Sequence, residues 1–432
     1  MKLVKMSLAA AVLLGASAFA IDNVKVSGDA KLFYGTNDMG DASLFSKGDA
    51  VKALTNGEGS YADTALRVSV TGDLAKGISF GATMYGVSTL GLENNLVSNT
   101  WTGAHGIGQN SNTAFAKNAI SGGAQVNDAG WIGELWTAAT LGKTTAKLGR
   151  MSLDTPLAFT ETWSIVPNTF EAAVLINQDI PDTTLVGAWV GKGNGGIHTE
   201  LAGAAVVGAD FGVVNQGGTF NTFVLDGAYA AAIVNNSFKP LVAQAWYYNV
   251  VDVADAYWLQ ADWDCQLIKG VKVGVQYADM SPKGTGIVVA GSDDSKAVAV
   301  KLAYTGVENL NVSAAYSDRN KNGGLNVANV ATTDAQSKLY TESYWSYGFV
   351  GASDATAWNL TAEYNVKDIA KLGAYYTNVN TDWANKSGDL SEVAVTASKS
   401  FGPLDTTLAY INTKANDANS YNTLQAYLTL NF

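Results

Sequence analysis

The chain has little of the material from which enzymes, disulfide-linked domains and helical membrane proteins are built. One cysteine and two histidines in 432 residues exclude an internal disulfide framework and leave few candidates for a zinc or catalytic group. After residue 20 no stretch reaches about 18 uninterrupted apolar residues, which argues against membrane-spanning helices. The six prolines fall in predicted loops and turns or at a strand start, where they interrupt no sheet.

Positive charge is also scarce. Acidic residues outnumber Lys and Arg by 38 to 27, so the chain is poorly suited to bind nucleic acid or another polyanion. His105 and His198 lie in separate predicted loops, and neither belongs to a recognisable nucleophile motif, which argues against an enzyme. Loop carboxylates could hold calcium loosely, but solvated loop acids are the commoner case. We therefore expect no cofactor and no metal site.

The first twenty residues have the features of a secretory signal peptide. Lys2 and Lys5 provide the positive start, residues 7–15 the apolar run, and residues 18–20 (Ala-Phe-Ala) the small side chains at a cleavage site. The apolar run is too short to cross a bilayer as a helix. We expect cleavage after residue 20 and, because no linker or composition shift divides the remainder, a single domain over 21–432.

Strand and turn formers are abundant, with 45 glycines, 19 tyrosines and 11 tryptophans beside many Val and Thr residues. About 18 segments alternate apolar and polar side chains, as strands with two different faces do. They are 24–37, 61–71, 78–88, 131–141, 144–151, 170–177, 184–191, 219–233, 239–249, 256–264, 271–279, 296–304, 310–318, 355–365, 371–380, 391–399, 404–413 and 422–432. A count of 16 strands is the alternative.

The connections between these segments alternate between short and generally longer ones. Short links such as 142–143 and 400–403 are followed by long ones such as 152–169 and 319–354, although 250–255 is brief. Short turns on one rim and long loops on the other are typical of an up-and-down membrane barrel. Because every backbone polar group must be paired in hydrocarbon, such strands have to close into a barrel. The sequence therefore predicts an all-β fold, a closed antiparallel transmembrane β-barrel.

Alternation alone also fits a soluble sandwich, which would bury its apolar face. The aromatic residues favour the membrane, because they fall near both ends of the predicted strands, as amphipathic rings at the two headgroup levels do. They are Tyr277, Tyr316 and Tyr376 at one level, and Trp263, Tyr304, Tyr364 and Phe432 at the other. The last strand, 422–432, ends in Phe432, and we expect it to pair with the first and close the barrel.

A barrel of this size encloses water, so inward charges become candidates for function. Arg67, Glu171, Asp262 and Lys301 each lie between two apolar neighbours and are predicted to line the pore. Each is either a solvated residue of a polar wall or a charge that tunes ion selectivity.

Segment 152–169 is the predicted constriction, a third loop folded inward, because it is mildly apolar and would make a poor surface loop. Leu157, Phe159 and Trp163 would pack against the wall. Asp154 and Glu161 would face the water, with Arg150 opposing them across the opening. Opposed charges create a transverse field that orients polar solutes.

Residues 149–157 (GRMSLDTPL) and 166–174 (VPNTFEAAV) resemble the third-loop region of OprD-like porins and of the related major outer membrane proteins of campylobacters. The resemblance implies an 18-stranded, trimeric channel for small hydrophilic solutes in a Gram-negative outer membrane. OprD-like channels for anionic substrates share an arginine-rich wall, whereas this chain has only Arg67, Arg150 and Arg319. This difference argues against carboxylate-substrate specificity.

The predicted function is an outer-membrane porin for passive diffusion of ions and small hydrophilic solutes. The acidic balance favours mild cation selectivity. Expected partners are outer-membrane lipid and lipopolysaccharide, the permeating solutes and two further copies of the chain. The alternative is a surface adhesin or structural barrel whose function resides in loops 89–130 and 319–354.

Overall fold

The structure is a computed structural model that describes most of the chain after the predicted signal peptide. The described residues are 21–47, 59–92, 96–97, 99–100, 102–105, 128–195, 213–224, 226–283, 293–332, 336–381, 388–416 and 418–432. The predicted signal peptide, 1–20, lies outside them. Within these ranges no helix has the length and apolar character needed to cross a membrane.

The described residues form eighteen strands of eight or more residues, which follow one another along the chain, and two further strands of two residues. They are β1 (Asp22–Asn37), β2 (Ser60–Ala75), β3 (Ile78–Ser88), β4 (Asn99–Thr100), β5 (Ala129–Leu141), β6 (Thr144–Met151), β7 (Phe170–Asn177), β8 (Thr183–Gly193), β9 (Asn221–Thr222), β10 (Ala228–Asn235), β11 (Leu241–Val250), β12 (Ala254–Asp264), β13 (Val271–Pro282), β14 (Ser295–Tyr304), β15 (Leu310–Arg319), β16 (Thr356–Val366), β17 (Ala370–Asn380), β18 (Leu390–Phe401), β19 (Leu404–Ala415) and β20 (Tyr421–Asn431).

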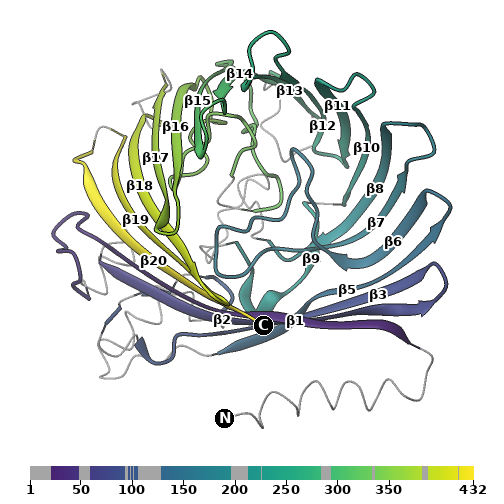
Figure 1. The fold of residues 1–432 in the computed structure, drawn as a ribbon, viewed down its shortest axis with the longest axis horizontal. Coiled ribbons are helices and arrows are strands. Elements are labelled where there is room, and N and C mark those ends of the chain that lie inside the picture. Colours follow the sequence, from purple (N-terminus) through teal and green to yellow (C-terminus); the bar gives the residue numbers. More distant parts are fainter. Residues whose placement is uncertain are drawn as a thin grey trace.

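Each long strand pairs antiparallel with its two neighbours, and β20 pairs with both β19 and β1. The ring is therefore closed, as Figure 1 shows, and the predicted 18-stranded antiparallel barrel is confirmed over the alternative of 16. The two short strands are additions: β4 lies parallel to β2, and β9 pairs with the end of β8.

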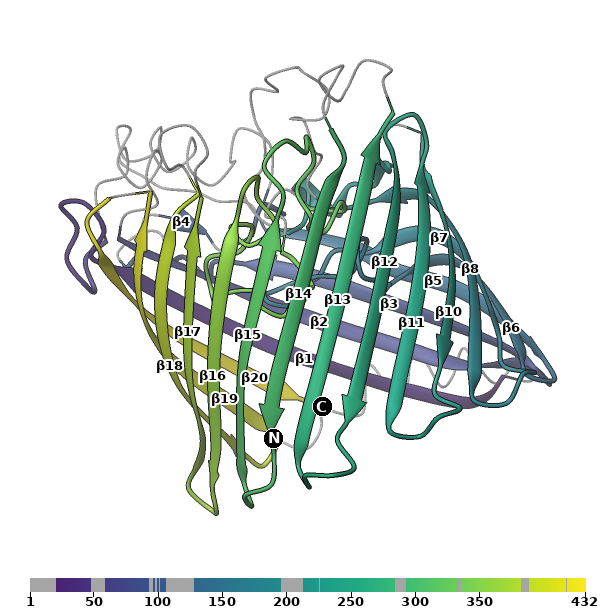
Figure 2. The same cartoon turned by 90° about the horizontal axis from the view of Figure 1, so that it is seen from above.

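The connections alternate as predicted. Turns of two to six residues, such as 76–77 and 265–270, join strands on one rim. Most connections on the other rim are far longer, and Figure 2 shows the two rims above and below the tilted strands. Both ends of the barrel, Asp22 and Asn431, lie on the short-turn rim.

One predicted strand begins too early. The segment predicted as 219–233 enters the barrel wall only at Ala228, where β10 starts. The preceding residues form β9 and a bend in which Val224 and Gly227 take positive φ angles of 55° and 83°. A backbone in this left-handed region cannot continue a strand. The alternating side chains before residue 228 therefore do not belong to a strand of the barrel wall.

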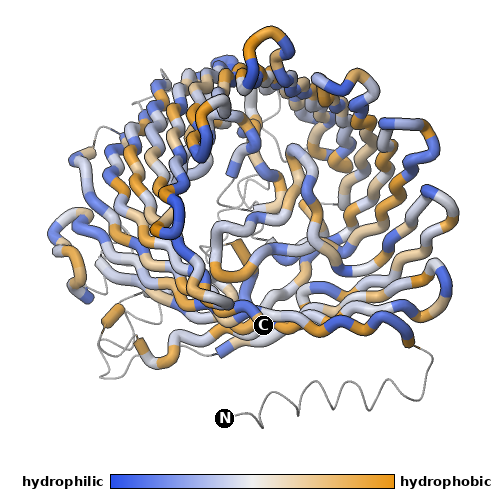
Figure 3. Tube along the Cα trace, in the orientation of Figure 1, coloured by the Kyte–Doolittle hydropathy of each residue, from blue (hydrophilic) through white to orange (hydrophobic). Residues whose placement is uncertain are grey.

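The outer face of the barrel is apolar. On β14, Val298, Val300 and Leu302 are about half exposed, while the alternating residues Ala297 and Ala299 are buried on the inner side. The hydropathy colouring alternates along the strands in the same way (Figure 3). Exposed aromatic rings mark the two ends of this band, for example Tyr376 toward the long-loop rim and Tyr304 and Tyr364 toward the short turns.

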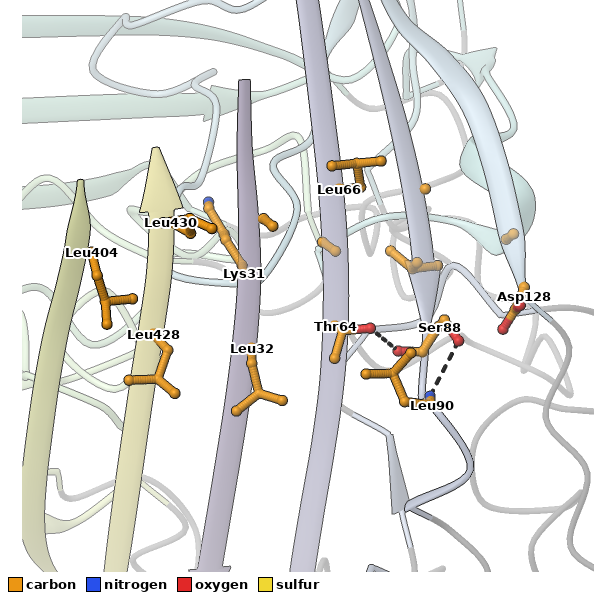
Figure 4. A pocket seen from close by; sticks show the side chains of 15 residues that line it. Lys31, Leu32, Thr64, Leu66, Ser88, Leu90, Asp128, Leu404, Leu428 and Leu430 are labelled. Carbon is orange, nitrogen blue, oxygen red and sulfur yellow. Dashed lines mark hydrogen bonds between the residues drawn. The ribbon is translucent and has the colours of Figure 1, made fainter. Parts of the chain in front are cut away.

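The seam between β1 and β20 is sealed at its end by the last residue. The Gly28 N–H donates to the Phe432 carbonyl over 2.9 Å, and the Phe432 N–H donates back to Gly28 over 3.0 Å. A side chain at Gly28 would meet the Phe432 ring at 2.6 Å, so glycine is required here. On the outer face Leu32 lies opposite Leu428, in an apolar groove of about 560 Å³ that Figure 4 shows from close by.

Candidate functional site

Two loops from the long-loop rim fold into the barrel and meet there: 152–169, between β6 and β7, and 320–355, between β15 and β16. Figure 1 shows chain crossing the interior of the ring of strands. In the first loop Leu157 and Phe159 are buried, and in the second Val327, Leu339 and Val350 are buried. Loops packed in this way narrow the lumen from within.

Glu161 connects the two loops through a set of hydrogen bonds, called here the Glu161 joint. Its carboxyl group is fully buried and accepts hydrogen bonds from Trp163 Nε1 at 2.7 Å, Asn329 Nδ2 at 2.8 Å and Thr332 Oγ1 at 2.6 Å. The backbone N–H of Gln336 adds a fourth at 3.3 Å. A buried charge is tolerated only when donors surround it in this way. The prediction that Glu161 faces the water is therefore wrong.

Backbone and amide bonds reinforce this joint. The Phe159 N–H donates to Asn329 Oδ1 at 3.0 Å, and Asn329 Nδ2 donates to the Phe159 carbonyl at 2.9 Å. The Val330 N–H donates to the Leu157 carbonyl at 2.8 Å. Because Asn329 pairs with both backbone groups of Phe159, it serves the first loop as an adjoining strand would.

The second loop is fixed to the wall of β12, β13 and β14. The Tyr340 N–H donates to Gln276 Oε1 at 3.0 Å, and the Tyr340 hydroxyl donates to Asp262 Oδ1 at 2.7 Å. Lys301 Nζ lies 4.3 Å from the centre of the Tyr340 ring, a favourable cation–π distance. At Gly274 an added side chain would meet the tyrosine hydroxyl at 2.5 Å, so this glycine makes room for the loop.

The same loop reaches the opposite wall. Glu392 on β18 accepts hydrogen bonds from the N–H groups of Trp345 and Ser346, both at 2.9 Å. The Trp345 ring stacks on Phe33 of β1 at 6.5 Å and meets Trp163 of the first loop edge-on at 6.0 Å. The loop pair therefore spans the lumen from β13 to the closing seam.

Burial, with a smaller contribution from the nearby Glu392 carboxyl, raises the pKa of Glu342 in the second loop to about 8. Hydrogen bonds from the Ser337 and Ser343 N–H groups oppose this shift. Its backbone carbonyl also accepts from Asn359 Nδ2 of β16 at 3.2 Å. A titratable group therefore lies at the contact between loop and wall.

Asp154 is the acid of the first loop that meets water, since 86% of its side chain is exposed. Lys338 of the second loop, 38% exposed, forms an ion pair with it. This pair spans the two loops on their solvent side. Asp154 therefore meets water, and its basic partner is Lys338 and not Arg150.

The remaining predicted residues divide between the two faces of the wall. Asp262 and Lys301 face the lumen beside Tyr340, and Arg67 pairs with Asp29 of β1 over 2.5 Å on the inner face. Arg150 and Glu171 bond to each other at 3.0 Å on the outer face. Their neighbours Met151 and Phe170 take the buried inner positions, so the assignment of Arg150 and Glu171 to the pore is wrong.

The structure also assigns roles that the sequence did not reveal. In the second loop, Asn329, Thr332 and Lys338 bind the first loop. Tyr340 binds the barrel wall. No alternation or motif marks these four residues. The third arginine, Arg319, is buried and donates to the carbonyls of Gly323 and Leu325, so it holds the base of that loop. His105 is bonded to buried Asp63 at 2.9 Å, and His198 lies outside the described residues.

A closed membrane-spanning barrel whose lumen is narrowed by inward loops is the architecture of a diffusion channel. The sequence matches the family of outer membrane porins called OprD over residues 104–380. The chain belongs to this family of outer-membrane porins, which places it in the outer membrane of a Gram-negative bacterium. The resemblance to OprD-like porins is thereby confirmed, and the further resemblance to the campylobacter proteins stays a prediction.

Solved structures share the fold at low sequence identity. The chain is similar to OccK8 (OprE) of Pseudomonas aeruginosa, with a TM-score of 0.67 and 15% identity over 95% of this chain and 98% of that one. It is also similar to opdK of Pseudomonas aeruginosa, with a TM-score of 0.68 and 11% identity over 95% of this chain and 99% of that one. No curated protein matches.

Proposed function

We propose that this porin is a mildly cation-selective channel for ions and small hydrophilic solutes, constricted by loop 152–169 together with loop 320–355. The joint at Glu161 carries the proposal, because it holds the two loops across the lumen with donors from both. Asp154, the most exposed charge among the described residues of the two loops, and the acidic composition favour cations near the opening. Within this proposal the chain has no catalytic role.

Conductance in planar bilayers tests the proposal. Purified, folded protein should open discrete ion-conducting channels, and reversal potentials under a salt gradient should show cation preference that weakens as salt screens the charges. Anion preference would contradict the selectivity. A folded protein that inserts without opening channels would instead favour the adhesin alternative.

The proposal also includes a homotrimer and a cleaved signal peptide. A closed cyclic assembly is expected to resist dissociation in mild detergent, so light scattering should give three times the chain mass. Sequencing of the purified protein from its amino terminus should begin at Ile21. A chain mass equal to that of a monomer would refute the homotrimer. An amino terminus at Met1 would refute cleavage of the signal peptide.

A further inference from the structure

An ionic row lies on the outer face of the barrel, where the wall meets lipid. Cross-strand pairing places Leu135, Arg150, Glu171 and Lys192 side by side on β5, β6, β7 and β8. Glu171 bonds to Arg150 Nε at 3.0 Å and lies 3.7 Å from Lys192 Nζ. Two cations face one acid, so the row carries a net positive charge beside the 55% exposed Leu135.

The height of this row places it at a lipid headgroup. The strands β6 and β7 have only eight residues each, against 13 in β5 and 11 in β8. Eight residues rise about 26 Å along a strand, or about 20 Å along the membrane normal at usual barrel tilt, which is less than the apolar band of about 25 Å. Arg150 and Glu171, at the long-loop ends of β6 and β7, therefore lie at or just below the outer boundary of the hydrocarbon.

The Arg150 guanidinium is held in place and still has donors available. Nη1 donates to the Ile132 carbonyl at 3.0 Å, and the ring of Phe220 packs 4.1 Å from the guanidinium carbon. Within the described residues Nη2 has no acceptor, and the Lys192 side chain is 52% exposed. A fixed guanidinium beside an ammonium suits phosphate, which takes guanidinium hydrogen bonds in pairs.

An apolar trough begins at this row and runs toward the short-turn rim. The first groove, of about 560 Å³, is lined by Leu148, Trp189 and the charged row itself. The second, of about 490 Å³, shares Leu148 and continues over Ala173, Leu175 and Gly187. Steps of two residues on a strand advance about 7 Å, so the trough extends about 13 Å from the charges. Small side chains along it leave room for a hydrocarbon chain.

We propose that this outer face of β5–β8 is a binding site for a phosphorylated acyl lipid of the outer leaflet, of the lipopolysaccharide class. The phosphate lies against Arg150 and Lys192, and an acyl chain lies in the trough over Leu148, Ala173 and Gly187. Glu171 lies close to both cations and offsets their mutual repulsion, so that they stay side by side.

The test measures retention of purified lipopolysaccharide by the delipidated full-length porin in detergent, with native mass spectrometry as readout. Wild-type protein should bind the phosphorylated glycolipid at about tenfold lower concentration than its enzymatically dephosphorylated form, and free inorganic phosphate should compete poorly. The R150Q/K192Q double variant should lose about 30-fold in affinity, as expected for two cations near a lipid surface. The control K283Q/K296Q removes two cations at the same rim on another part of the wall and should bind as wild type.

A second variant tests the trough independently of charge. An added side chain at Gly187 meets open space, so Gly187→Phe should leave the barrel folded, with its usual heat-dependent shift on gels, yet weaken lipid retention. Equal binding of the phosphorylated and dephosphorylated lipids, or unchanged binding by R150Q/K192Q, would overturn the proposal. If these variants lose the oligomer but retain lipid, the lipid-site proposal is overturned, because a second copy of the chain then covers the outer face of β5–β8.

Discussion

Replacing Glu161 by Ala should open the constriction without unfolding the barrel. The substitution removes a fully buried acceptor of four hydrogen bonds, three of them from side chains. Buried donors left without an acceptor cost about 1–3 kcal/mol each. Among the side-chain donors, Asn329 also bonds to Phe159, whereas Trp163 and Thr332 lose this acceptor. At about 2 kcal/mol each, these two donors give about 4 kcal/mol against docking of the two loops.

A loss of about 4 kcal/mol raises the ratio of undocked to docked loops by about 700-fold. Single-channel recordings in planar bilayers should then show larger and noisier conductance, and proteoliposomes should admit larger sugars in swelling assays. The barrel should keep its heat-dependent shift on gels, because its strand pairing does not involve Glu161. Glu308→Ala, which removes an exposed acid from a short turn, is the matched control. Conductance and noise equal to wild type in a folded Glu161→Ala protein would refute the role of this joint.

Three further predictions follow from the site and the seam. Asp154→Asn should lower cation preference and Lys338→Gln should raise it, as measured by reversal potentials; unchanged potentials would place the selective charges elsewhere. Docking of the second loop should weaken as pH rises from about 4.5 to about 8. In the docked loop, burial raises the pKa of Glu342 to about 8, whereas in an undocked loop the pKa returns to about 4.5. Between these values undocking releases the Glu342 proton, so rising pH favours the undocked state. Channel noise should rise over that range in wild type, and an equal rise in Glu342→Gln would exclude this group. Gly28→Val should lower the temperature at which the barrel unfolds on gels, because the carboxy-terminal ring and a backbone carbonyl occupy that space, whereas Gly187→Val on the open outer wall should not.

The barrel wall could be predicted because its determinants are local. Alternation sets the face of each residue, and the predicted bounds 78–88, 144–151 and 170–177 are those of β3, β6 and β7. The prediction of 219–233 as a strand was wrong at its start because alternation does not report backbone bends. Arg150 and Glu171 were assigned to the wrong face although Leu148, two residues earlier, shares the outer face with Arg150.

The constriction could be predicted only in outline. The apolar character of 152–169 correctly indicated an inward loop, and Asp154 meets water. Glu161 could not be placed, because its burial depends on donors supplied by another long loop. Local sequence does not show which distant residues will donate hydrogen bonds to a buried carboxylate. The contribution of the second loop, and of its Lys338, was therefore not predicted.

The joint between the loops has a consequence for the order in which the protein is assembled. The Asn329 and Thr332 donors lie 168 and 171 residues after Glu161 in the chain. Contacts between residues so far apart form late in folding. The Glu161 carboxyl therefore lacks three of its four donors until β15 and the loop after it are in place. Narrowing of the pore is then an event separate from closure of the wall. A cell that inserts barrels faster than their loops dock would become permeable to toxic solutes, so mutations in 320–355 should increase sensitivity to large hydrophilic antibiotics even where channel numbers are unchanged.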